Sequence, residues 1–141
     1  MRRQDFVLAT IAACEGAIYS PVQVQKMFFL LERNLAPRTF APRFSFKSYH
    51  YGPYSKEVYD DLEALAAEAL AAIHAEGSWR RFALTTAGIA QGRRALAVLP
   101  LPVQKYIKQV SDFVLRLSFS ELVSAIYKAY PDMRKNSVFR E

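Results

Sequence analysis

The sequence predicts a mostly α-helical protein with a small β element. Apolar residues recur at helical spacing in several segments, and two Ser-x-x-Gln/Glu patterns mark helix starts as capping boxes. Short runs in which polar and apolar residues alternate indicate a few strands. Because the chain has 141 residues, we expect a single domain over residues 1–141 with a core of its own.

A first helix is expected over about residues 3–14. Its apolar stretch follows two arginines and faintly resembles a secretory signal, but Asp5 precedes it and Glu15 closes it, so an ordinary helix is favoured. Cys14 lies at its end, where an apolar helical setting favours an inert buried thiol. As the single cysteine it cannot form an intrachain disulfide, which favours a cytoplasmic protein.

A second helix has a stronger start signal. Ser20 is expected as the N-cap, Pro21 at the first helical position, and Gln23 completes a capping box. Its buried face is expected to comprise Val24, Met27, Phe28, Leu31 and Leu35. Pro37 and Pro42 then bracket a polar, basic loop.

The next segment predicts a strand, a turn and a third helix. Residues 44–48 alternate as a short strand does. The strand is expected to end at Gly52-Pro53, because glycine reaches backbone angles closed to other residues and proline fixes φ near the helical value. The helix then begins with Pro53 or Ser55 near its first position. The alanine-rich run AAEALAAIHAE is expected to extend it to a stop at Gly77.

Residues 79–84 alternate again, and Thr85 or Thr86 is expected to cap a fourth helix. The predicted elements follow the order of a winged helix-turn-helix core, namely helix, helix, short strand, helix, strand pair and helix. We place this core over about residues 3–98. An irregular α-rich bundle with incidental strands is the alternative.

Two more helices are expected in a C-terminal extension over about residues 101–141. The first should run from about residue 102 to 117. Ser118 and Glu121 form the second capping box, and the helix that they open should end before Pro131.

Charge is distributed unevenly in a chain of net charge +6. Residues 80–108 form a strip of bases without acids, namely Arg80, Arg81, Arg93, Arg94, Lys105 and Lys108. Residues 57–76 carry only acids, namely Glu57, Asp60, Asp61, Glu63, Glu68 and Glu76. The predicted recognition helix thus offers Lys56 against five acids, which disfavours DNA contact through it. The basic strip remains a candidate for contacts to a nucleic-acid backbone.

Catalytic and metal-binding patterns are missing from the sequence. The two histidines and the cysteine have no zinc spacing, and there is no phosphate-binding glycine loop. Asp60 and Asp61 are interpreted as part of a solvated acidic face rather than as paired catalytic carboxylates. No apolar run approaches the ~20 residues that a membrane span requires. We therefore expect neither an enzyme nor a cofactor, metal or membrane partner.

The tyrosine-rich segment suits a protein interface instead, because tyrosine combines contact area with a polar tip. The alternative for any one of these residues is that the charges are solvated and the tyrosines packed in the core. The candidate partner-binding residues are Tyr49, Tyr51, Gly52, Pro53, Tyr54, Lys56, Glu57, Tyr59, Asp60 and Asp61. Replacing Asp60 and Asp61 by lysine is expected to weaken a partner complex and leave the fold intact.

Three motifs carry a family resemblance. VQKMFFLLE, YHYGPYSKEVYDDLEAL and FALTTAG resemble the Panacea or SocA-like antitoxin domain and related YwgA-like bacterial proteins, over about residues 6–139. The resemblance implies a small α-rich domain that neutralises a toxin or acts as an adaptor or defence-associated accessory protein. The positions of this sequence that match the family's motifs, and to which a functional role would carry over, are Gln25, Lys26, Tyr51, Gly52, Pro53, Val58 and Tyr59. The sequence departs from the commoner Leu-Tyr by having Phe28-Phe29.

The leading hypothesis is a non-enzymatic, cytoplasmic interaction module that binds a co-encoded protein, a toxin or a defence component. The alternative is a winged-helix DNA- or RNA-binding transcriptional regulator that uses the basic strip. A third hypothesis is a homodimer built through the two C-terminal helices.

Overall fold

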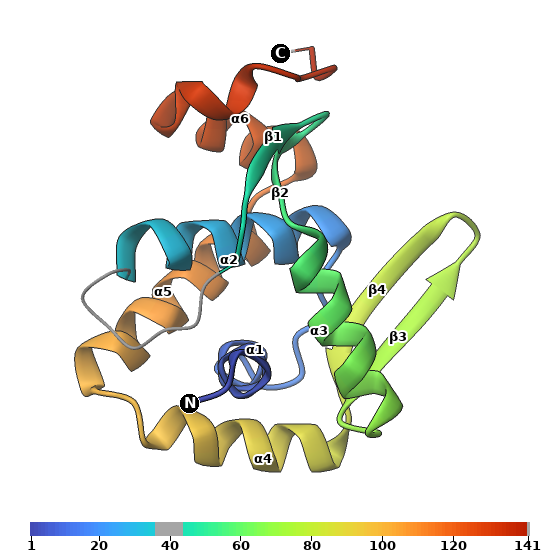
Figure 1. Ribbon diagram of the computed structural model, residues 1–141, viewed down its shortest axis with the longest axis vertical. Coiled ribbons are helices and arrows are strands. Elements are labelled where there is room, and N and C mark those ends of the chain that lie inside the picture. Colours follow the sequence, from blue (N-terminus) through green and yellow to red (C-terminus); the bar gives the residue numbers. More distant parts are fainter. Residues whose placement is uncertain (36–43, 141) are drawn as a thin grey trace.

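The computed structural model describes residues 1–35 and 44–140 (Figure 1). Over these residues the helices are α1 (Arg3–Ala12), α2 (Pro21–Leu35), α3 (Lys56–Ala67), α4 (Thr86–Ala97), α5 (Leu101–Arg116), α6 (Phe119–Ala129) and the 3-10 helix η1 (Pro131–Arg134). The strands are β1 (Lys47–Tyr49), β2 (Gly52–Tyr54), β3 (Ala71–Glu76) and β4 (Trp79–Leu84). Each consecutive pair of strands forms a two-stranded antiparallel sheet. The prediction of a mostly α protein with a small β element is confirmed.

The three predicted cap sites are also confirmed. Ser20 accepts from the Gln23 N–H at 3.2 Å, and the Gln23 side chain accepts from the Ser20 N–H at 2.8 Å. Ser118 and Glu121 form the same reciprocal pair. Thr85, rather than Thr86, is the N-cap of α4.

Helix α1 lies at the centre of the molecule, with α2 and α5 on one side, α3 and α4 on the others (Figure 1). Its residues Phe6–Ala12 are all buried. It crosses α4 closely at Gly92, where a Cβ atom would lie 2.5 Å from the Leu8 carbonyl oxygen. The core therefore forms around the first helix of the chain.

The elements from α1 to β4 follow the predicted order, except that the β1–β2 hairpin takes the place of the single short strand expected between α2 and α3. The backbones of Tyr19, between α1 and α2, and Phe82 of β4 exchange two hydrogen bonds of 2.9 Å, an isolated antiparallel bridge that joins the segment before α2 to the β3–β4 wing. A helix-turn-helix motif has a turn of three or four residues between its helices. Here residues 36–55, which include the β1–β2 hairpin, separate α2 from α3.

The segment around Gly52-Pro53 differs from the prediction. The chain turns at His50 and Tyr51, and Gly52 and Pro53 belong to a second strand, so Pro53 is not the start of the helix. Helix α3 begins at Lys56, after Ser55 as N-cap. The predicted strand over residues 44–48 is observed later, at Lys47–Tyr49. The proline-bracketed loop between residues 36 and 43 lies outside the described residues.

The alanine-rich run does not extend α3, contrary to prediction. The helix ends at Ala67, Ala69 takes a φ of 60°, and the Leu70 N–H donates to the Leu65 carbonyl. Residues 71–76 then pair with β4, and Gly77 turns the hairpin at φ 62°. The strand pairing overrides the high helix propensity of alanine, which is worth only fractions of a kcal/mol per residue.

Candidate functional site

A cleft of about 440 Å³ opens between the start of α2, the β1–β2 hairpin and the tip of the wing. Its walls are aromatic and comprise Tyr49, Tyr51, Tyr54, Tyr59, Trp79 and Phe119. The α2 and β2 side comprises Ser20, Pro21, Val22, Gln25, Lys26, Gly52 and Pro53. Six of the ten candidate partner-binding residues thus line one cavity, namely Tyr49, Tyr51, Gly52, Pro53, Tyr54 and Tyr59.

Ring contacts connect the hairpin to the wing. The ring centroids of Tyr49 and Tyr54 lie 5.1 Å apart, those of Tyr54 and Tyr59 lie 5.8 Å apart, and Tyr59 stacks on Phe82 at 5.7 Å. The Arg80 guanidinium lies 4.7 Å from the centre of the Tyr59 ring. Such contacts hold the rings in fixed relative positions, so the cleft wall is largely formed before anything binds.

The rim of the cleft exposes large apolar rings to solvent. Trp79 is 66% exposed, Tyr51 is 44% exposed, and Phe119 packs edge-on against Tyr51 at 5.1 Å. Exposed apolar groups that gather around a cavity typically mark a binding site. Trp79 was not among the predicted partner-binding residues, because its position next to the tyrosines depends on how the wing folds back toward α2.

Gln25 joins α2 to the start of α3. Its side-chain amide donates to the Ser55 carbonyl at 2.9 Å and accepts from the Ser55 N–H at 2.8 Å. Both residues are buried. Gln25 therefore fixes the end of β2 against α2 and gives the cleft a rigid base.

Lys26 is the unusual polar group of the site. It is 3% exposed, and its ammonium donates to the Pro53 carbonyl at 3.4 Å. Burial lowers the pKa of Lys26 to about 7. Gly52 covers it at a φ of 107°, and a Cβ there would lie 3.1 Å from the Lys26 Cε atom. The sequence already indicates that Lys26 is buried, because it lies four residues after Val22 and three before Phe29 on an apolar helix face.

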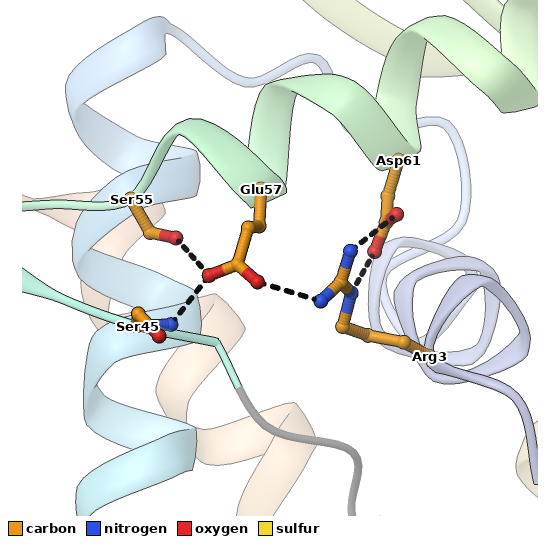
Figure 2. Close-up of polar contacts among 5 residues, drawn as sticks. All are labelled: Arg3, Ser45, Ser55, Glu57 and Asp61. Atoms are coloured by element: carbon orange, nitrogen blue, oxygen red, sulfur yellow. Dashed lines mark hydrogen bonds and ion pairs between the residues drawn. The ribbon is translucent and has the colours of Figure 1, made fainter.

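Two of the predicted surface acids, Glu57 and Asp61, pair with Arg3, and Asp61 is buried, which corrects the interpretation of a solvated acidic face. Arg3 donates to Asp61 at 2.6 Å and 3.1 Å and to Glu57 at 3.0 Å (Figure 2). Asp61 is only 4% exposed. Glu57 also accepts from the Ser45 N–H at 2.7 Å, and this bond together with Arg3 lowers the pKa of Glu57. The network ties α3 to α1 and to the chain before β1.

The remaining charges of α3 do face solvent. Asp60 pairs with Lys56 at 3.5 Å, and Glu63 pairs with Arg80 at 3.2 Å. The predicted partner surface therefore separates into the tyrosine cleft and an outer helix face. Replacing Asp60 and Asp61 together by lysine would remove the Asp61 partner of Arg3, so we now expect this pair of substitutions to destabilise the fold.

The predicted basic strip is spread over β4, α4 and α5. Arg80 is paired with Glu63, and Arg93 is paired with Glu15. Four exposed bases form no ion pair within residues 1–35 and 44–140, namely Arg81, Arg94, Lys105 and Lys108. Within the strip, these four are the cations that remain available to a polyanion.

Other candidate chemistry has a clear structural setting. His50 stacks on Tyr49, with ring centroids 4.2 Å apart. Cys14 follows the end of α1 and is half-buried rather than buried as predicted. Among the described residues, no three His, Cys, Asp or Glu side chains gather as metal ligands. In that same part of the chain, no helix has the length and apolar character that crossing a membrane requires.

Comparison with models of known protein families finds no match, and none of the curated proteins compared is significantly similar. The resemblance to the Panacea or SocA-like domain therefore rests on the motifs quoted above, of which the Gly-Pro motif lies in the cleft.

Proposed function

We propose that this protein is a non-enzymatic interaction module of the antitoxin or adaptor type, and that it binds a co-encoded bacterial protein through the aromatic cleft. The observation that carries the proposal is the rim of exposed rings around a preformed cavity. Tyrosine and tryptophan are the residues most enriched in the energetic centres of protein interfaces. Because the wall is rigid, little conformational entropy is lost when a partner binds.

The charge next to the cleft indicates what kind of partner surface fits. The exposed side chains of α3 include Asp60 and Glu63, and Glu68 follows at its C-cap. An acidic face beside an aromatic cleft complements a partner with an apolar anchor and basic flanking residues. Lys56 and Arg80 pair with two of these three acids, so the face keeps a small negative excess, which favours a protein partner over the phosphates of a duplex at this position.

The test is binding of the product of the neighbouring gene, measured by calorimetry with purified proteins. Trp79→Ala and Tyr51→Ala should each weaken the complex by ~30-fold or more if these rings are anchors. Val98→Ala, which alters an exposed apolar residue away from the cleft, is the matched control and should leave affinity unchanged. If all three variants bind with the affinity of the wild type, the partner does not bind in the cleft.

A second candidate function is binding of DNA or RNA through the wing and α4. The observation that favours it is that Arg81 and Arg94 are exposed and form no ion pair within the described residues. These bases suit contacts to the phosphate backbone rather than base reading.

A further inference from the structure

We propose that the cleft captures the carboxyl terminus of a partner polypeptide, with the terminal carboxylate on the Lys26 ammonium and the last, apolar side chain against the aromatic wall. This inference rests on the proposed function and names the part of the partner that the cleft recognises.

Within residues 1–35 and 44–140, the Lys26 ammonium has one long acceptor contact, to the Pro53 carbonyl. A lysine ammonium has three N–H donors, and the Pro53 carbonyl at 3.4 Å is a long contact for one of them. Burying such a cation is costly unless it is paired. The lowered pKa has burial as its cause, without a contribution from any nearby carboxylate. An anion that enters the cleft would satisfy donors that the folded chain leaves unmatched.

Among the described residues, the groups that neighbour Lys26 supply no carboxylate partner for its ammonium. The other titratable side chains lining the cleft are Tyr49, Tyr51, Tyr54 and Tyr59. From α6, Tyr127 lies 3.6 Å from the position of a Cβ on Gly52. On α3, Glu57 and Asp61 are engaged by Arg3. The Arg80 guanidinium lies over the Tyr59 ring and is paired with Glu63, and the Arg134 guanidinium lies over the Tyr127 ring. Among the described residues that line the cleft, Lys26 is therefore a buried cation between aromatic walls.

A chain end fits this site better than an internal acidic residue does. A terminal residue carries the carboxylate and an apolar side chain on the same Cα, so it matches both the cation and the rings. An internal Asp or Glu would also bring two flanking peptide groups into an apolar cavity, where each needs a hydrogen-bond partner. A cavity of about 440 Å³ suits a short segment rather than a continuous strand. Capture of a terminal carboxylate is a known mode of peptide recognition.

The test uses two probes that differ only at the terminus, acetyl-Leu-Phe with a free carboxylate and acetyl-Leu-Phe-amide. Each is titrated into the ¹⁵N-labelled full-length protein and followed by NMR. The acid should shift the Gly52 amide and the Trp79 indole signals and bind tenfold to a hundredfold more tightly than the amide. Acetyl-Phe-Glu-amide, which carries only a side-chain carboxylate, should bind like the amide.

Lys26→Met keeps the length of the side chain and removes the charge. The variant should bind acid and amide equally, at the affinity that the wild type has for the amide. In the wild type, the preference for the acid should shrink from pH 6 to pH 9 as Lys26 loses its proton. In the variant it should not change with pH.

Equal binding of acid and amide by the wild type would overturn the proposal without reference to any variant. So would equally tight binding of the glutamate-amide probe, since that outcome makes the carboxylate an internal one. The two proposals fail separately. If the neighbouring gene product binds through Trp79 while acid and amide bind alike, only this inference is wrong. If that product does not bind, the proposed function is wrong.

Discussion

Lys26 is the residue in which folding and the proposed function are in conflict. A methionine at this position would pack in the same apolar surroundings without the cost of burying a charge. The folded protein instead places a lysine under Gly52, where it lies against β2 and has a lowered pKa. A group that destabilises the empty protein in this way typically belongs to a functional site.

The lowered pKa of Lys26 predicts how stability depends on pH. Between pH 7 and about 10 the unfolded chain binds a proton at Lys26 that the folded chain does not, so the free energy of unfolding should rise with pH there. Below pH 7 both states bind the proton, and the folded state carries the full burial cost. Lys26→Met should therefore be more stable than the wild type at pH 6, on the order of a few kcal/mol.

Urea denaturation of both proteins at pH 6, 7.5 and 9 measures this effect. The stability difference between variant and wild type should narrow as the pH rises. Lys56→Met changes an exposed lysine and should give a difference that does not vary with pH. A constant difference for Lys26→Met as well would mean that the residue does not titrate in this range.

At the scale of elements, one polar network holds α3, the helix that supplies Tyr59 to the cleft. Helix α3 is bound to α1 by Arg3, Asp61 and Glu57 (Figure 2), and to α2 by Gln25 and Ser55. Residues far apart in sequence therefore determine the position of α3, and with it that of Tyr54 and Tyr59.

Asp61→Asn tests this network, since it keeps the shape of the side chain and removes its charge. The Arg3 guanidinium would lose a charge-assisted pair of hydrogen bonds, and stability should fall by about 1–2 kcal/mol, an amount that allows for the partial exposure of Arg3. Asp60→Asn, one residue away on the exposed face, should change stability by less than about 0.5 kcal/mol. Thermal unfolding measures both, and equal effects would contradict the structural role of Asp61.

At the scale of the whole molecule, the bases of the predicted basic strip are divided among three elements of a chain whose net charge is +6. The bases lie on β4, α4 and α5, and Arg80 and Arg93 are neutralised by acids from other elements. The phosphates of a duplex would attract the bases of the wing and repel the acids of α3.

Mobility-shift titration with duplex DNA at low salt tests the second candidate function. If Arg81 and Arg94 contact phosphates, binding should weaken steeply with salt, and Arg81→Ala with Arg94→Ala should reduce that dependence by about two counterions. Lys56→Ala, on α3, serves as the matched control and should have no effect. A flat titration of the wild type would remove this function.

The positions of most helices followed from the sequence, because caps and helical periodicity are local signals. Ser20, Thr85 and Ser118 all cap the helices predicted for them. The helix predicted for the alanine-rich run was wrong for a non-local reason, because residues 71–76 form a strand by pairing with Trp79–Leu84. The tyrosines of the site were identified from their density in the sequence, but Trp79 and Phe119 reach it only through the fold.

By itself, the sequence determined the capped starts of three helices, the small β content and the tyrosine-rich segment, since these depend on spacing and on backbone preferences of residues close together. Only the tertiary structure decided which acids are internal and what the tyrosines surround. It turned Glu57 and Asp61 toward Arg3, and it placed Lys26 beneath the Gly-Pro strand. The physical reason is that burial and pairing of charge are set by contacts between distant segments, which local sequence patterns do not contain.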